Sequence, residues 1–140
     1  MSVQIPVTSM LGSAYASDNG LDLVAREGVT LKPLGRALVK TGFACAKPER
    51  VVGMVCPRSG LALKHGVTVL NAPGIIDTGY RNEVGVILAN ISDEEYTVVP
   101  GDRVAQLVII EQPDYELVLV DELPGAVDGR GMGGFGSSGR

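Results

Sequence analysis

The sequence predicts a single all-β domain of the sandwich, jelly-roll or barrel kind, followed by a glycine-rich tail. Short apolar runs recur between turns marked by Gly, Pro and Asn, which is typical of these folds. Glycine accounts for 19 of the 140 residues, which favours many turns over long helices. Aromatic residues make up only 4%, so Val, Ile, Leu and Ala must build the core. A chain of this length suits one domain.

The first half of the chain contains four expected strands and one short helix. Leu21–Val24 and Ala37–Ala44 are apolar runs of strand length. Val51–Cys56 has the same character and stops at a proline, which is disfavoured inside a sheet. Val67–Leu70 stops at the turn sequence Asn-Ala-Pro-Gly. Between the last two runs, Ser59–His65 fits one or two helical turns.

The second half contains four more expected strands. Val84–Ile91 is apolar without alternation and runs into the acidic turn Ser-Asp-Glu-Glu. Tyr96–Val99 ends at a Pro-Gly-Asp turn, and Val104–Ile110 and Glu116–Val120 follow. Because continuous apolar runs bury both faces, one such face is a candidate for contact with another subunit.

Residues 125–140 differ from the rest of the chain, with seven glycines in sixteen residues and no core-forming pattern. Ordering such a tail costs about 1–2 kcal/mol per residue in backbone entropy. We therefore expect a flexible arm that a ligand or a neighbouring chain holds in place. The sequence divides into a β domain of residues 1–124 and an arm of residues 125–140.

Composition argues against several classes of partner. The net charge of −4 disfavours non-specific binding to nucleic acid or anionic lipid. No stretch approaches the ~20 apolar residues of a membrane-spanning helix, and the N-terminus lacks a signal-peptide pattern. Cys45, Cys56 and His65 are too few for a disulfide framework or a zinc site. We expect a cytoplasmic protein that binds neither nucleic acid nor a membrane.

The turn after the run Val51–Cys56 carries three residues suited to an anion. Arg58 supplies a forked cationic donor, Ser59 supplies a hydroxyl group, and Gly60 lets a ligand approach the backbone closely. Backbone N–H groups at the start of a helical turn also favour an anion. The sequence therefore predicts a phosphate site here, with an ordinary exposed turn as the alternative.

The segment Asn71–Tyr80 is predicted to be a hairpin tip between apolar strands. Asn71 can donate and accept hydrogen bonds, which suits the edge of a nucleobase. Asp77 lies among apolar residues and is a candidate general base, while Tyr80 offers a flat face to a sugar or a base. The alternative is that Asn71 and Asp77 only satisfy the backbone of the turn.

Two further segments place polar residues where a turn enters a strand. Asp18 and Asp22 flank one turn and are candidate oxygen ligands for a metal with phosphate, directly or through water. The alternative is a pair of ordinary turn aspartates. Gln106 lies in an apolar run, so its amide needs a hydrogen-bond partner. Asp102 and Arg103 are expected to form an ion pair within a turn.

The tail carries polar groups of its own. Arg130 and the hydroxyl groups of Ser137 and Ser138 suit phosphate oxygens, and Phe135 suits stacking on a base. A plain linker and an RGG-like nucleic-acid tail are the alternatives. The net negative charge of the chain and the single phenylalanine of the tail disfavour the nucleic-acid tail.

Together these five segments, in this order, resemble the motifs of the deoxyuridine triphosphatase family (dUTP pyrophosphatase, homotrimeric type). The resemblance implies a jelly-roll-like distorted β-barrel and a homotrimer with three shared active sites. It also implies Mg²⁺-dependent hydrolysis of dUTP to dUMP and pyrophosphate, which supplies dUMP for thymidylate synthesis. The matching segments are 16–23, 57–62, 71–83, 101–108 and 130–139.

The resemblance implies a role for each matching residue. Asp77 matches the aspartate that activates the attacking water. Gln106, Arg58 and Ser59 match the residues that place the water and the phosphates, and Asp22 matches an aspartate that holds the metal through water. The expected substrate contacts are Gly60, Asn71, Gly74, Ile75, Tyr80, Arg130, Phe135, Gly136, Ser137 and Ser138.

The resemblance also implies which part of the substrate each of these residues contacts. The hairpin residues Asn71, Gly74 and Ile75 match positions that read uracil, and Tyr80 matches a tyrosine that leaves no room for a 2′-hydroxyl group. The arm, supplied by another subunit, would grip the terminal phosphates and cover the uracil with its phenylalanine. Asn82 stands where the family usually has glycine, and asparagine tolerates a positive φ.

Two rival readings predict no pyrophosphate release from dUTP. The related dCTP deaminase family places a catalytic glutamate in the strand after the hairpin, and that position falls on Ile87, which cannot transfer a proton. A non-catalytic nucleotide-binding or regulatory module would have lost Asp77, Arg130 or the tail. All three are present.

Overall fold

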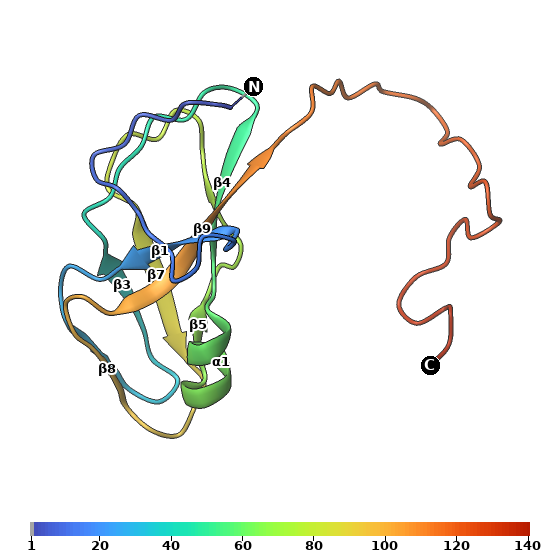
Figure 1. The fold of residues 1–140 in the computed structure, drawn as a ribbon. Helices are drawn as coiled ribbons and strands as arrows, with labels where there is room; N and C mark the ends of the chain where they lie inside the picture. The colour runs from blue at the N-terminus through green and yellow to red at the C-terminus, as the bar shows by residue number, and fades with distance from the viewer. Residues whose placement is uncertain (1) are drawn as a thin grey trace.

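The computed structural model describes residues 2–140 and confirms an all-β chain with one short helix (Figure 1). Helix α1 (Ser59–His65) lies between the fourth and fifth strands. Within the described residues the strands are β1 (Gly20–Val24), β2 (Val29–Leu31), β3 (Arg36–Lys40), β4 (Val51–Cys56), β5 (Val67–Val69), β6 (Gly74–Ile76), β7 (Gly85–Asn90), β8 (Tyr96–Val98) and β9 (Arg103–Glu111).

The strands pair antiparallel in three sheets. One sheet has the order β1-β9-β4-β6, a second has the order β3-β7-β5, and β2 pairs with β8. In β4 the burial alternates, so that Val51, Gly53 and Val55 face the core and the residues between them face outward. The core between the sheets is aliphatic, as the composition predicts, with Leu23, Leu88 and other apolar residues fully buried.

Local signals place several elements where the sequence predicts them. Strand β4 and helix α1 have the predicted bounds. The helix ends because Gly66 adopts a left-handed conformation with φ of 63°, and its N–H donates to the carbonyl oxygen of Ala62. Leu61 anchors the helix in the core. The helix is seven residues long, and no helix in the described part of the chain could cross a membrane.

Other elements differ from the prediction. The expected strand over 37–44 ends at Lys40, because Gly42 has a φ of +71° and turns the chain. Cys45 then makes only an isolated bridge with Val7. Strands β2 and β6 were not predicted as strands, and each is only three residues long.

The expected strand Glu116–Val120 is wrong for the single chain. After β9 the chain leaves the sheets and extends away as an arm, drawn in orange and red in Figure 1. Leu117 is 89% exposed and Leu119 is 99% exposed, so this apolar run packs against nothing in its own chain. A strand needs a neighbour for its backbone groups, and the described residues provide none here.

Candidate active site

A polar pocket with a volume of about 620 Å³ lies over β1, β9 and β4. We call it the cationic pocket. Antiparallel register sets Asp22 of β1 opposite Gln106 of β9, and sets Gln106 opposite Cys56 of β4. The functional side chains that line the pocket are Asp22, Arg58, Ser59, Gly60, Arg103 and Gln106.

Charges in the cationic pocket alternate in sign. The Asp22 carboxylate lies 3.9 Å from Nε of Arg58 and 3.8 Å from a terminal guanidinium nitrogen of Arg103. Arg58 also donates a hydrogen bond of 2.9 Å to the main-chain oxygen of Arg103. Two guanidinium groups around one carboxylate can bind a larger anion, and the carboxylate remains available to a cation bound with that anion.

Arg103 is a pocket residue that the sequence interpretation missed. The expected ion pair between Asp102 and Arg103 is wrong: among the ion pairs of the described residues, Arg103 faces Asp22. Asp102 instead accepts a hydrogen bond of 2.9 Å from the Val99 N–H, which completes the turn before β9. No local signal marks Arg103, because it reaches the pocket only through the pairing of β1 with β9.

The predicted need of Gln106 for a partner is confirmed. Its Nε2 donates a hydrogen bond of 2.8 Å to the carbonyl oxygen of Pro57. Pro57 immediately precedes Arg58 and Ser59, so this bond ties β9 to the start of the predicted phosphate turn. The first N–H groups of α1 lie in the same turn and lack partners within the helix.

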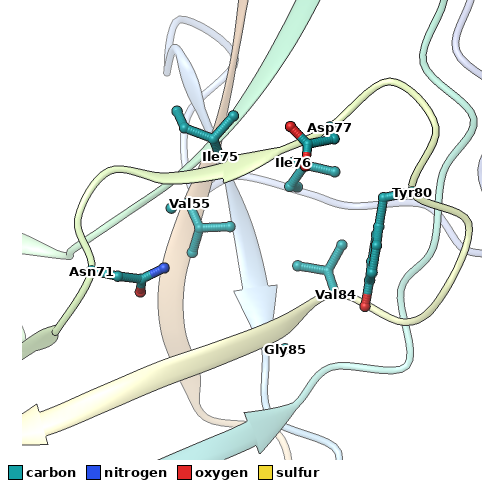
Figure 2. Close-up of a pocket in the computed structure, with 9 residues that line it drawn as sticks. Val55, Asn71, Ile75, Ile76, Asp77, Tyr80, Val84 and Gly85 are labelled. Carbon is teal, nitrogen blue, oxygen red and sulfur yellow. The ribbon is translucent and has the colours of Figure 1, made fainter.

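Another pocket has a volume of about 140 Å³ and lies at the predicted hairpin segment 71–80. That segment is not a simple hairpin tip: it belongs to the connection from β5 to β7 and contains β6, which pairs with β4. We call this pocket the hairpin pocket. Figure 2 shows Asn71 at one end, Asp77 and Tyr80 at the other, and the side chains of Val55 and Val84 between them. The apolar walls and polar ends suit a flat ring with hydrogen-bonding edges. The residues that line it are Val55, Asn71, Gly74, Ile75, Ile76, Asp77, Tyr80, Val84 and Gly85.

The hairpin pocket depends on a close approach at Gly74. A Cβ atom on Gly74 would lie 3.2 Å from Nδ2 of Asn71 and 3.3 Å from Cβ of Val55, so a larger residue would push the amide away. Tyr80 is held at the other end, because its hydroxyl group donates a hydrogen bond of 2.7 Å to the main-chain oxygen of Glu83. Asn82 has no positive φ, so the turn does not require the usual glycine.

An ion pair holds the turn that carries Tyr80. Arg26 donates two hydrogen bonds to the Glu83 carboxylate, at 2.6 Å and 3.0 Å, and the Gly42 N–H donates to the same group. The pKa of Glu83 lies below its ordinary value, first because of the Arg26 hydrogen bonds and then because of the Gly42 N–H. Arg26 and Glu83 were not among the predicted site residues, because they are 57 residues apart in the chain.

The two pockets lie on opposite faces of the same sheet. Val55 lines the hairpin pocket and its neighbour Cys56 lines the cationic pocket. Consecutive residues of a strand point to opposite faces, so β4 separates the two pockets. The chain therefore brings the predicted site residues together in two groups and does not join the groups.

The arm reaches neither pocket of its own chain. Arg130 donates a hydrogen bond of 2.9 Å to the main-chain oxygen of Gly133, and the N–H of Ser137 donates to the oxygen of Gly134. Phe135 is fully exposed. Neither pocket includes Arg130, Phe135, Gly136, Ser137 or Ser138 among its lining residues.

Residues 2–140 contain no group of three or more His, Cys, Asp and Glu side chains able to hold a metal ion. Mg²⁺ typically keeps several waters and is bound by one or two carboxylates together with substrate phosphates. Asp22, in a pocket with two guanidinium groups, fits a site in which one carboxylate and the substrate phosphates bind the ion together. The donor set suits an ion that arrives with a phosphate ligand.

Comparison with known proteins identifies relatives over nearly the whole chain. The dUTPase family model matches residues 8–139. The deoxyuridine 5'-triphosphate nucleotidohydrolase of Anaeromyxobacter sp. (strain Fw109-5) is 56% identical over 128 residues, which cover 90% of this chain and 86% of that protein. The protein of the same name from Bifidobacterium longum subsp. infantis is 51% identical over 133 residues, covering 94% of this chain and 82% of that protein.

Solved structures are similar to this fold. A mutant dUTPase of Staphylococcus bacteriophage 80alpha with dUpNHpp has a TM-score of 0.89 at 28% identity, covering 99% of this chain and 100% of that chain. A mutant dUTPase from phage phi11 of S. aureus, described with a structural Mg(II) ion, has a TM-score of 0.78 at 27% identity. That match covers 86% of this chain and 98% of the phage chain.

Proposed function

This chain belongs to the dUTPase family, and we propose that it hydrolyses dUTP to dUMP and pyrophosphate by attack of water on the α-phosphorus. The observation that carries this proposal is the match of two pocket chemistries to two halves of one substrate. The hairpin pocket suits a base and sugar, and the cationic pocket suits a triphosphate. The chain is a dUTP diphosphatase, whose product dUMP we assign to thymidylate synthesis.

In the hairpin pocket, the Asn71 amide and the backbone of Gly74 and Ile75 would read the uracil edge. The ring of Tyr80 would pack under the deoxyribose, because its hydroxyl group is fixed to the Glu83 oxygen. A ring fixed in this way would leave no space for a 2′-hydroxyl group. The same pocket would therefore select both the base and the sugar.

Asp77 is the proposed general base. It would take a proton from water as the water oxygen bonds to the α-phosphorus and the bond to the pyrophosphate oxygen breaks. Gln106 would orient that water and the phosphate. Arg58, Ser59 and Gly60 would hold the phosphate oxygens by charge, hydroxyl and backbone N–H.

Mg²⁺ is the proposed cofactor, and Asp22 would hold it through water. When bound, the ion would neutralise charge on the phosphate oxygens. The two guanidinium groups beside Asp22 add positive charge at the same place. The pocket would thus bind the triphosphate with its metal as one unit.

The proposed active form is a homotrimer with shared sites. One dUTP molecule cannot occupy two pockets that lie on opposite faces of a sheet, so a neighbouring subunit would bring its cationic pocket to the hairpin pocket. The arm would come from a further subunit, with Arg130, Ser137 and Ser138 at the phosphates and Phe135 over the uracil. The exposure of the apolar run around Leu117 and Leu119 supports an arm that packs on another subunit.

Pyrophosphate release tests the proposal. We would measure release from dUTP, dCTP, dTTP and UTP in parallel, each with Mg²⁺ and with EDTA. Release from dUTP alone, abolished by EDTA, is the expected result. Ammonia release from dCTP in place of pyrophosphate from dUTP would indicate a deaminase, and no product from any nucleotide would indicate a binding module.

A further inference from the structure

Gly20 lies in the cationic pocket beside the side chain of Gln106. It is the first residue of β1 and pairs with Val108 of β9, while Asp22 pairs with Gln106. Residues 20 and 106 are therefore diagonal neighbours on one face of the sheet. This face is the floor of the cationic pocket.

The backbone at Gly20 does not require glycine, since its φ lies outside the left-handed region. The side chain of Gln106 is the reason why residue 20 must be glycine. A Cβ atom on residue 20 would lie 2.9 Å from Cδ and 3.1 Å from Cβ of Gln106, and closer still to Oε1. The Gln106 amide thus occupies the space that any side chain at position 20 would need.

The amide has a defined orientation in that space. Its Nε2 donates to the carbonyl oxygen of Pro57 at 2.8 Å, and its Oε1 lies over Gly20. The hydrogen bond reaches the residue directly before Arg58 and Ser59. Moving the amide would therefore break the link between β9 and the phosphate turn.

We propose that Gly20 is a positioning residue, which leaves room for the Gln106 amide to bond Pro57 and face the triphosphate. The proposal rests on the function proposed above, in which Gln106 orients the water and the phosphate. The claim that Gly20 leaves room for the Gln106 side chain does not depend on which substrate binds.

Gly20→Ala is the direct test. The atoms in the way are mostly the far end of a flexible side chain, so we expect the Gln106 amide to swing aside while β1 and β9 stay paired. Displacing a positioned group by about 1 Å can cost about 100-fold in rate. We expect kcat for dUTP to fall by about 10- to 100-fold, with an unchanged midpoint of urea unfolding.

A double-mutant cycle separates positioning from a general structural effect. The four proteins are the wild type, Gly20→Ala, Gln106→Ala and the double variant. Once Gln106 is truncated, Gly20→Ala should lower kcat by less than twofold. The matched control is Gly12→Ala, because a Cβ atom there meets no atom within 4 Å, and its kcat should equal that of the wild type. An equal loss from Gly20→Ala with and without the glutamine side chain would overturn the proposal.

A crystal structure of Gly20→Ala gives a readout that does not depend on activity. We expect the distance from Gln106 Nε2 to the Pro57 oxygen to exceed hydrogen-bond length. An unmoved amide would refute the positioning role even if kcat fell. If the wild type releases no pyrophosphate from dUTP, the proposed function fails, and this distance still decides the role of Gly20.

Discussion

Asp77 and Lys47 represent two opposite situations for a charged side chain. Asp77 lines the hairpin pocket and is exposed, so its carboxylate can meet a water and a substrate. Lys47 is 3% exposed, and its Nζ has no hydrogen-bond partner among the described residues. The first arrangement suits the proposed general base, and the second carries a cost in stability.

Asp77→Asn should preserve nucleotide binding and remove most turnover. The amide keeps the shape of the carboxyl group and cannot accept the proton, and general-base catalysis typically contributes about 10²- to 10⁴-fold. Steady-state pyrophosphate release at saturating dUTP measures kcat, and calorimetry with a non-hydrolysable dUTP analogue measures binding. Turnover close to that of the wild type would rule out Asp77 as the base.

Lys47→Met should stabilise the protein. Methionine keeps an unbranched stem against Gly53, where the Lys47 chain now packs, and it removes a buried ammonium group without a partner. Such a group costs about 1–3 kcal/mol, so the free energy of unfolding should rise by about that amount. Urea denaturation at pH 7 is the measurement. The exposed control Lys32→Met should change it by less than about 0.5 kcal/mol, and a less stable Lys47→Met would show that the ammonium is satisfied.

The strands act on the site through their register. Pairing of β1 with β9 brings Asp22, Gln106 and Arg103 into one pocket, and β4 separates that pocket from the hairpin pocket. The loop before β7 has no strand pairing to fix its position. It is held by the ion pair between Glu83 and Arg26, which lies two residues after β1, and Glu83 also accepts a hydrogen bond from the Gly42 N–H.

The Glu83 ion pair should make stability depend on acid pH. The pKa of Glu83 is lowered in the folded chain, so its contribution is fully present above the ordinary value of 4.5 and is lost as pH falls through the lowered folded value. Glu83→Gln should remove that dependence. The measurement is the free energy of unfolding by urea between pH 7 and pH 3.

The wild type should lose more stability than Glu83→Gln over this pH range. Glu95→Gln is the control, because Glu95 is exposed and the substitution removes the same charge. The Glu95→Gln variant should follow the wild-type pH curve. Parallel curves for Glu83→Gln and the wild type would show that the ion pair adds nothing to the pH dependence.

In the described part of the chain, the cationic pocket, the hairpin pocket and the arm do not meet. The site proposed above therefore takes surfaces from more than one copy. The glycine-rich arm is suited to this task, because it can stay open until a substrate repays the entropy of ordering it. These features give two predictions about the assembled protein.

Deleting residues 129–140 should leave a folded trimer that has lost activity. The arm makes its hydrogen bonds within itself, so its removal takes nothing from the core. Loss of the residues proposed to cover the substrate should lower kcat/KM by about 100-fold or more. Gel filtration with light scattering reports the assembly, and full activity of the shortened chain would refute a covering arm.

Mixing two inactive variants should restore activity. If one site takes Asp77 from one subunit and Arg58 from another, then Asp77→Asn and Arg58→Ala chains refolded together at equal amounts should form intact sites. Random assembly leaves about a quarter of the sites with both residues intact. The control is the same mixture without unfolding. No recovery after refolding would place both residues within one subunit.

Elements with strong local signals were predictable from the sequence. Strand β4 and helix α1 are bounded by proline and glycine, and the polar residues of the hairpin lie within ten positions of one another. The strands β2 and β6 have only three residues each, which is too short for a recognisable hydrophobic pattern. The run Glu116–Val120 has the composition of a strand, and its own chain offers it no partner.

The residue types of the candidate site are visible along the chain, and their arrangement in space is not. The types of residue at Asp22, Arg58, Asp77 and Gln106 point to phosphate binding and proton transfer wherever the strands place them. Their division between two faces, the approach of Arg103 to Asp22 and the fit of Gln106 over Gly20 come from strand pairing. Pairing joins segments more than 80 residues apart, and the burial of whole surfaces decides it. No local stretch of sequence contains that information.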